Sequence, residues 1–236
     1  MKEGLTIVKI GGALLEEEDL LDSVSRAFAG LEGARILVHG GGKRASRVGA
    51  ALGVTPRLVD GRRITDLETL EVVTMVYGGW ANKTLVARLQ SLGCNALGLS
   101  GADADLIRAV KRPAGEIDYG YVGDVQQVSA ERLIRILKAG FIPVFCALTH
   151  DGNGQLLNTN ADTVAAEIAM ALAGDYRVRL CYLFEKPGVL LRPEDPGSVI
   201  PGLDRARVGL LRREGRIAEG MIPKLDNAFR ALEQGV

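Results

Sequence analysis

Residues 34–52 read ARILVHGGGKRASRVGAAL, a buried strand that runs into three glycines and then into a helix. The first turn of this helix carries two cations, Lys43 and Arg44. A helix N-terminus already bears about half a positive charge, so a cation there costs up to about 1 kcal/mol unless an anion lies nearby. Because glycines let backbone N–H groups approach oxygen atoms closely, we interpret this segment as a phosphate-binding turn.

Short apolar segments rich in β-branched residues alternate with helical segments along the chain. Strands that are buried on both faces are typical of a largely parallel sheet covered by helices on both sides. The sequence therefore predicts an α/β fold. The predicted strands are LTIVKI (5–10), ARILVH (34–39), NALGLS (95–100), FIPVFCAL (141–148) and VRLCYLF (178–184).

Composition excludes several classes of protein. With 236 residues, 47% of them hydrophobic, the chain can form one large domain or two lobes. The 29 basic residues equal the 29 acidic ones, so no overall positive charge favours nucleic acid or an anionic membrane as a partner. No apolar run approaches the about 20 residues of a membrane span, so we expect a soluble protein.

Cysteine and histidine lack the spacing of a metal site. Cys94, Cys146 and Cys181 lie in apolar surroundings without paired spacing, which argues against a zinc site or a disulfide framework. His39 and His150 have no partners at ligand spacing. We therefore expect no metal held by protein ligands and a reducing, cytoplasmic location.

One long helix and an edge hairpin are predicted in the middle of the chain. Residues 65–68 (TDLE) match a capping box that opens a helix to about Leu92, with Gly78 and Gly79 as a kink or close-packing point. Residues 101–128 combine β-propensity with turn residues and predict one or two hairpins at the sheet edge.

The glycine-rich turn is open to a second interpretation. HGGGKRAS is not a Walker A loop, because Leu37 stands where the first glycine is required. It does match G-x-G-x-x-A through Gly40, Gly42 and Ala45, and Asp60 lies near the usual place of a ribose-binding carboxylate. An NAD(P)-dependent oxidoreductase is therefore an alternative function.

Two lysines stand where a cation is unfavourable. Lys9 lies within a buried strand and precedes Gly11 and Gly12, which favours a second anion cradle; the alternative is an edge lysine whose ammonium group reaches water. Lys224 follows Pro223 at a helix start; the alternative there is a solvated surface lysine. A dehydrogenase has no need of a second glycine turn.

Acidic, amide and arginine side chains complete the candidate site. Asn158, Asn160 and Asp162 surround a helix start, where they are expected as caps, and Asp162 would also supply a carboxylate between the two lysines. Arg62 and Arg63 lie in a turn before the long helix, where guanidinium groups suit a carboxylate-bearing substrate; a solvated surface turn is the alternative.

Nine motifs in order resemble the amino-acid kinase superfamily, and within it the N-acetyl-L-glutamate kinase family. The resemblance implies an open, three-layer αβα sandwich, with residues 1–173 as a substrate lobe carrying a dimerisation helix and residues 174–236 as a nucleotide-binding lobe. The last helix ends next to the final residue, so one hypothesis is that the last strand of this lobe is missing from the chain. The motifs are VKIGG, VHGGGK, DGRRIT, NKTLVA, LSGADA, GYVGDV, NTNADTVAAEIA, KPGVL and GMIPK.

The resemblance implies ATP-dependent phosphorylation of the γ-carboxylate of an N-acyl-L-glutamate, a step of arginine biosynthesis, by a homodimer that receives Mg²⁺ together with ATP. It also implies that Lys9, Lys224 and Asp162 are the catalytic residues. The γ-carboxylate has an unperturbed pKa of about 4.3 and is already ionised at pH 7, so no general base is required. Stabilising the charge on the phosphoryl oxygens is then the main task.

Binding residues follow from the same motifs. The resemblance implies that Gly12 and Gly41, with their neighbours Gly11 and Gly42, bind the phosphates. It also implies that Arg63 and Asn158 bind the carboxylate end of the substrate. Before the turn at GVL, relatives often carry Thr or Ser followed by Asp. This chain instead has Phe184, Glu185 and Lys186 there, so the residues that form the nucleotide pocket are left open. No arginine feedback inhibition is expected.

The acyl group is left open by the sequence. N-acetyl is the expected group. Arg108, Lys111 and Arg112 in the hairpin region would also suit N-succinyl, whose extra carboxylate needs a cation. The alternative is that they are solvated charges guarding a sheet edge. A non-catalytic ligand sensor on the same fold is a further alternative function.

Overall fold

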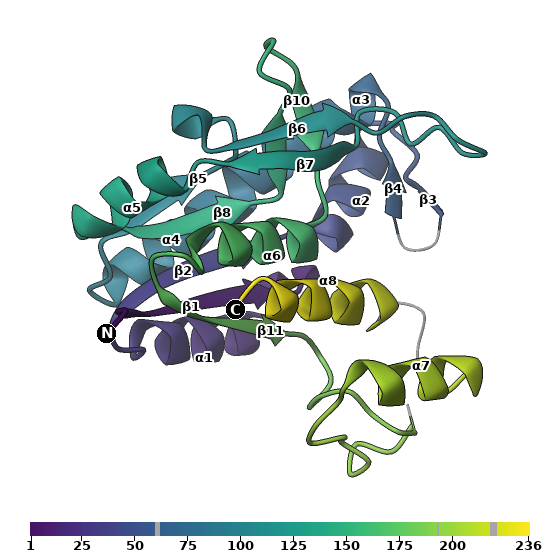
Figure 1. The fold of residues 1–236 in the computed structure, drawn as a ribbon. Helices are drawn as coiled ribbons and strands as arrows, with labels where there is room; N and C mark the ends of the chain where they lie inside the picture. Colours follow the sequence, from purple (N-terminus) through teal and green to yellow (C-terminus); the bar gives the residue numbers. More distant parts are fainter. Residues whose placement is uncertain (60–61, 193, 218–220) are drawn as a thin grey trace.

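The computed structural model describes residues 1–59, 62–192, 194–217 and 221–236 (Figure 1). Its centre is a five-stranded, fully parallel sheet in the order β11-β1-β2-β8-β5. Each strand coincides with one of the five predicted segments, which confirms the predicted α/β fold. The strands are β1 (Gly4–Ile10), β2 (Ala34–His39), β5 (Ala96–Leu99), β8 (Ile142–Cys146) and β11 (Arg177–Leu183).

Helices cover both faces of this sheet. Alternate residues of β1 point to opposite faces, so Ile7 belongs to an apolar cluster shared with α6 (Ala161–Leu172) and α5 (Ala130–Lys138), while Val8 belongs to one shared with α1 (Glu18–Ala29). Each face therefore has its own apolar core, and the arrangement is a three-layer sandwich. Further helical elements are η1 (Gly12–Leu15), α2 (Gly42–Ala51), η3 (Asp103–Asp105), α7 (Arg205–Arg213) and α8 (Ile222–Glu233).

The predicted long helix has a wide turn at its centre. It runs through α3 (Leu67–Val73), the π-helical segment η2 (Thr74–Ala81) and α4 (Asn82–Ser91). The predicted irregularity at Gly78 and Gly79 therefore lies within the π-helical segment. Such segments are frequent at functional sites, because the extra residue in the turn redirects the neighbouring side chains.

The start of this helix differs from the predicted capping box. Asp66 is the N-cap, since its carboxylate accepts a hydrogen bond of 2.9 Å from the backbone N–H of Thr69. Thr65 is one residue too early: its N–H donates to the carbonyl of Tyr119, and its hydroxyl donates to the carbonyl of Arg63. Pairing with a neighbouring segment holds Thr65 outside the helix.

A second, smaller sheet in the order β10-β9-β6-β7 lies beside the first (Figure 1). The antiparallel pair β6 (Ile107–Lys111) and β7 (Gly123–Val128) confirms the predicted hairpin. The hairpins β9–β10 and β3–β4 were not predicted, because their three-residue strands are too short for a recognisable alternation. They comprise β3 (Arg57–Val59), β4 (Arg62–Ile64), β9 (Leu148–His150) and β10 (Leu156–Asn158).

The C-terminal part of the chain is joined to the rest through two elements. Strand β11 pairs with β1 in the central sheet, and α8 packs against α6. Around α7, a small separate apolar cluster includes Ile200, Val208 and Leu211. The division of the chain into lobes at residue 173 stays a prediction. No helix within the described ranges is long and apolar enough to cross a membrane.

Candidate active site

One buried carboxylate holds two lysines near the carboxyl end of β1, a strand inside the central sheet. Asp162 Oδ1 lies 2.7 Å from Lys9 Nζ, and Asp162 Oδ2 lies 2.6 Å from Lys224 Nζ. Asp162 and Lys9 are only 4% and 7% exposed. The structure therefore brings together the three residues predicted to be catalytic, although they lie far apart in the sequence.

Local structure explains how this group forms. Lys9 shares the face of β1 that carries Ile7, and this face is covered by α6. Asn160 caps α6 as predicted, because its side-chain oxygen accepts from the N–H groups of Asp162 (2.8 Å) and Thr163 (3.1 Å). The cap fixes the first turn of α6, and α8 then places Lys224 beside it.

The shared carboxylate sets the protonation of the group. Burial acts to raise the pKa of Asp162, but the positive charges of Lys9 and Lys224 outweigh it, so this pKa lies below its ordinary value. Burial lowers the pKa of Lys9 by more than the Asp162 charge raises it. Two ammonium groups on one carboxylate leave a positive charge, which suits a phosphoryl group in transit.

The glycine turns after β1 and β2 face each other. A Cβ atom on Gly12 would lie 3.2 Å from the backbone nitrogen of Gly42 and 3.3 Å from that of Gly41. Any larger residue at position 12 would therefore crowd these N–H groups. Gly11 does not fit its predicted role, because its N–H donates to the carbonyl of Leu183 at 2.9 Å and is not free to bind a phosphate.

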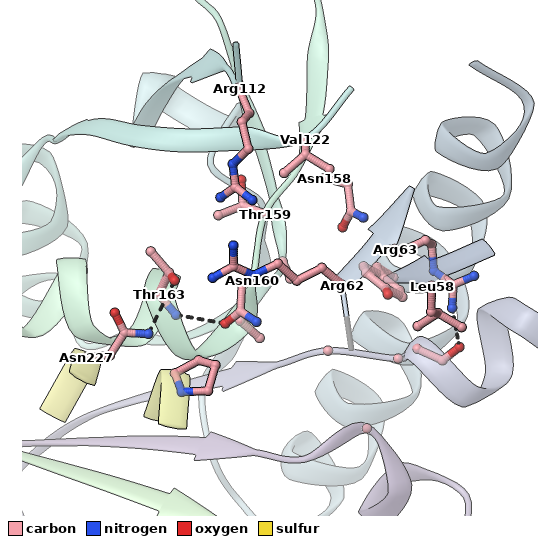
Figure 2. A pocket seen from close by; sticks show the side chains of 18 of the residues that line it. Leu58, Arg62, Arg63, Arg112, Val122, Asn158, Thr159, Asn160, Thr163 and Asn227 are labelled. Atoms are coloured by element: carbon pink, nitrogen blue, oxygen red, sulfur yellow. Dashed lines mark hydrogen bonds between the residues drawn. The ribbon is translucent and has the colours of Figure 1, made fainter. Parts of the chain in front are cut away.

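A cavity of about 400 Å³ opens beside these turns (Figure 2). Lys9, Lys224 and Asp162 are not among its lining residues, but Ala161 and Pro223, which precede Asp162 and Lys224, are. The ion-paired group thus lies next to residues that line the cavity. The described lining residues are Gly12, Gly40, Gly41, Gly42, Leu58, Arg62, Arg63, Tyr77, Arg112, Val122, Ala147, Asn158, Thr159, Asn160, Ala161, Thr163, Ile222, Pro223, Asp226 and Asn227.

Both residues predicted to bind the substrate carboxylate line this cavity. Arg63 is 9% exposed and donates from one nitrogen to the carbonyl of Gly42 (2.8 Å) and the hydroxyl of Ser46 (2.7 Å). It therefore also holds the second glycine turn. Asn158 donates to the hydroxyl of Thr65 at 3.0 Å, which orients its amide group.

Tyr77 lines the cavity and was not singled out in the sequence. Its ring packs so closely on Gly41 that a Cβ atom there would lie 2.8 Å from the ring, and burial raises the pKa of its hydroxyl. No local pattern could have identified Tyr77, because the π-helical segment η2 decides where its side chain points.

His39 contacts the second glycine turn through the carbonyl of Gly40. Burial lowers its pKa to about 4, so the ring is neutral at pH 7. Its Nδ1 lies 2.8 Å from the carbonyl of Gly40 and therefore carries the proton, while Nε2, 3.1 Å from the side-chain nitrogen of Asn82, accepts. His39 is thus a turn-orienting residue.

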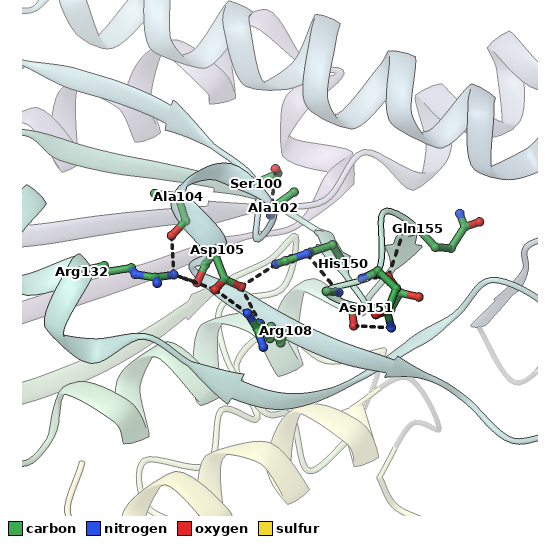
Figure 3. Close-up of polar contacts among 11 residues, drawn as sticks. Ser100, Ala102, Ala104, Asp105, Arg108, Arg132, His150, Asp151 and Gln155 are labelled. Atoms are coloured by element: carbon green, nitrogen blue, oxygen red, sulfur yellow. Dashed lines mark hydrogen bonds and ion pairs between the residues drawn. The ribbon is translucent and has the colours of Figure 1, made fainter.

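The three hairpin cations have different surroundings. Arg108 binds Asp105 through two hydrogen bonds of 2.7 and 2.8 Å (Figure 3). His150 Nε2 lies 3.1 Å from the same carboxylate. Lys111 lies 4.7 Å from the ring of Tyr121. Of the three cations, Arg112 lines the cavity, whereas Arg108 and Lys111 are exposed and do not line it, which fits the alternative of solvated charges for these two.

Lys43 and Asp60 were singled out in the interpretation of the glycine-rich turn at residues 40–42. Lys43 is exposed, with its Nζ 3.8 Å from Glu185, and does not line the cavity. Asp60, the ribose-binding residue of the oxidoreductase alternative, lies outside the described residues. No group of three or more His, Cys, Asp or Glu side chains suited to a metal ion occurs in the described part of the chain.

Comparisons with known proteins agree with this geometry. The sequence model of the Amino acid kinase family matches residues 4–236. Acetylglutamate kinase of Bacteroides fragilis is 52% identical over 236 residues, covering 100% of this chain and 90% of that protein. Acetylglutamate kinase of Parabacteroides distasonis is 53% identical over 234 residues, covering 99% and 92% of the two chains.

A solved structure gives the same result for the fold. The crystal structure of smu.665 from Streptococcus mutans UA159 matches with a TM-score of 0.81 and 26% identity, covering 98% of this chain and 91% of the other. The likeness therefore extends over almost the whole of both chains.

Proposed function

Since this chain belongs to the amino acid kinase family, we propose that it phosphorylates the γ-carboxylate of N-acetyl-L-glutamate with ATP, a step of arginine biosynthesis. The relatives named acetylglutamate kinase, at about half identity over the full chain, support the acetyl compound. The structural observation that carries the proposal is the Lys9–Asp162–Lys224 group beside a glycine-lined cavity.

Some residues of the site supply charge, and others orient the substrate. The two ammonium groups of Lys9 and Lys224 neutralise the phosphoryl oxygens, and Asp162 keeps both lysines in place before the substrates arrive. Preorganised charges of this kind are usually the largest contribution to catalysis. Arg63 and Asn158 orient the α-carboxylate, so that the ionised γ-carboxylate attacks the phosphoryl group in line.

The cavity suits a nucleotide phosphate. The backbone N–H groups of Gly41 and Gly42 face a space that a single Cβ atom on Gly12 would fill. Such a turn at a helix N-terminus is a ready site for anions. Mg²⁺ would arrive with the phosphates, keep several water ligands and neutralise further charge.

A coupled assay of ADP release with N-acetyl-L-glutamate tests the proposal. We expect turnover that depends on both ATP and the acylated amino acid and that is lost in Lys9→Met, whereas Lys138→Met, at an exposed position of α5, keeps it. Binding of N-acetyl-L-glutamate without ADP release would favour the ligand-sensor alternative. Binding of NADH but not of ATP would favour the oxidoreductase alternative.

We further propose that the protein is a homodimer built on the helix of residues 67–91. Leu67 and Met75 of this helix are each 53% exposed, so a second copy of the chain that packs on this helix would bury two large apolar side chains. Light scattering should give twice the chain mass, and Met75→Glu should halve it. A monomer at every concentration would contradict the proposal. The two-lobe division and the cytoplasmic location stay predictions.

A further inference from the structure

A chain of buried hydrogen bonds links the start of α4 to the second glycine turn. The side-chain nitrogen of Asn82 lies 3.1 Å from Nε2 of His39, and Nδ1 of His39 lies 2.8 Å from the carbonyl oxygen of Gly40. Asn82 and His39 are 1% and 0% exposed, so bulk water does not compete for these bonds. Asn82 and Lys83 begin the sequence motif NKTLVA, to which the proposed function gives no role.

The amide group of Asn82 has one orientation that satisfies its neighbours. Its nitrogen lies 2.8 Å from the carbonyl oxygen of Val144, which can only accept, and its oxygen lies 3.1 Å from the ammonium group of Lys83, which can only donate. A Cβ atom on Gly98 would lie 2.1 Å from the same oxygen, so the absence of a side chain at Gly98 makes room for the amide. The nitrogen of Asn82 is therefore the atom that faces His39.

Asn82 and Gly40 impose the same tautomer on His39. Asn82 donates to Nε2 and the carbonyl of Gly40 accepts from Nδ1, so the one proton of the neutral ring lies on Nδ1. Burial lowers the pKa of His39 to about 4, so the ring gains no second proton at pH 7. Because a buried Nε2 without a donor is unfavourable, Asn82 also holds the ring in this orientation.

The carbonyl of Gly40 and the N–H of Gly41 belong to one peptide group. This group is planar, and no cis peptide bond occurs among the described residues, so the N–H points away from the carbonyl. A hydrogen bond to the Gly40 carbonyl therefore also fixes the direction of the Gly41 N–H. The nitrogen of Gly41 lies 3.3 Å from the place that a Cβ atom on Gly12 would take, in the proposed phosphate site.

We infer, on the basis of the proposed function, that Asn82 is a positioning residue for ATP. It acts through His39: the amide holds the ring in the tautomer and orientation that donate to Gly40, and the fixed peptide group aims the Gly41 N–H at a phosphate oxygen. Asn82 is not among the residues that line the cavity, so it acts on ATP only through the turn. An N–H that is aimed before ATP arrives loses no freedom when ATP binds.

Asn82→Asp replaces the donor by an acceptor of the same shape and makes the KM for ATP depend on pH. The new carboxylate should raise the pKa of His39, so that in acid the ring carries two protons and donates to both partners. As pH rises through this pKa, one proton is left, and the charged acceptor competes for it better than the Gly40 carbonyl does. We expect the KM for ATP to be close to the wild-type value in acid and about tenfold above it at higher pH.

Two controls separate this effect from a general loss of structure. Asn95→Asp removes a bond of the same kind at an exposed position, since Asn95 donates to the carbonyl of Gly140 at 3.1 Å, and it should leave the KM for ATP unchanged. His39→Asn keeps a side-chain N–H close to the place of Nδ1 but has no ring to titrate. With His39→Asn already present, Asn82→Asp should no longer make the KM for ATP depend on pH.

Nuclear magnetic resonance of ¹⁵N-labelled histidine reports the tautomer directly. The chain has two histidines, so the signals that remain in His150→Gln are those of His39. We expect a neutral ring with its proton on Nδ1 in the wild type at pH 7. In Asn82→Asp, both nitrogens should carry protons in acid, and Nδ1 should lose its proton as pH rises.

A wild-type ring with its proton on Nε2 would overturn the inference. A KM for ATP that equals the wild-type value in Asn82→Asp at every pH, or that shifts equally with and without His39→Asn, would also overturn it. If Asn82→Asp does not fold, Asn82→Ala replaces it, and its KM for ATP should rise only while His39 is present. If the wild type binds Mg-ATP but releases no ADP, the proposed function fails, and calorimetric dissociation constants for ATP decide the inference in place of KM. A wild type that binds no ATP refutes both.

Discussion

Replacing Asp162 by asparagine removes the charge that holds Lys9 and Lys224 together but keeps the shape of the side chain. Both ammonium nitrogens contact oxygens of the one carboxylate, at 2.7 and 2.6 Å. They therefore lie within about 8 Å of each other, and at an effective dielectric constant of about 20 they repel by about 2 kcal/mol or more. Since breaking a buried ion pair at one partner costs about 3–5 kcal/mol, we expect Asp162→Asn to lower the free energy of unfolding by that amount.

Urea unfolding at pH 7, followed by the fluorescence of the single tryptophan, Trp80, measures this loss. Asp226→Asn is the matched control, because the carboxylate of Asp226 is 58% exposed and its pair with Arg212 contributes little. Adding Lys9→Met to Asp162→Asn should recover part of the loss, because it removes the repulsion. An Asp162→Asn protein as stable as the control would refute the reasoning.

The pH dependence provides an independent check. The pKa of Asp162 is lowered in the folded protein, so its stabilising contribution is complete above the unfolded value of about 3.9. That contribution is lost as pH falls through the lowered, folded pKa. The stability difference between the wild type and Asp162→Asn should therefore be largest near neutral pH and shrink in acid. A difference that stays constant from pH 7 into the acid range would contradict the shifted pKa.

Three further predictions concern catalysis. Lys9→Met and Lys224→Met should each lower kcat about 10²- to 10³-fold in the ADP-release assay, and near-normal turnover would exclude that lysine from catalysis. Because burial lowers the pKa of Lys9, kcat/KM should fall as pH rises through a value below 10.5. In Lys9→Arg this fall of kcat/KM at alkaline pH should disappear. If it is unchanged, another group causes it. Gly12→Ala places a Cβ atom 3.2 Å from the nitrogen of Gly42, so the KM for ATP should rise about tenfold while that for the acylglutamate is kept; unchanged ATP kinetics would remove Gly12 from the phosphate site.

The five strands of the central sheet and the starts of α2 and α6 could be predicted because their signals are local. Segments such as residues 34–39 and 178–184 are short and mostly apolar, a pattern that favours strands of a parallel sheet covered by helices. Asn160 was predicted correctly as a cap for the same reason. The capping box at Thr65 was wrong by one residue, because a backbone pairing with Tyr119, distant in sequence, decides which residue enters the helix.

The sequence by itself determined the sheet, the two glycine turns and the residue types of the site, since these depend on periodicity and on glycine at turns. Only the tertiary structure decided which side chains meet. Asp162 lies between Lys9 and Lys224 because α6 packs on β1 and α8 packs on α6.

The β6–β7 hairpin is a second case in which the sequence does not determine which groups a charged side chain contacts. Arg108 and Arg112 are four residues apart, which in a strand is about 13 Å. That distance is enough to place Arg108 on Asp105 and Arg112 in the cavity. Sequence alone does not distinguish them, because the partner of a charged side chain is set by the segments that pack beside it.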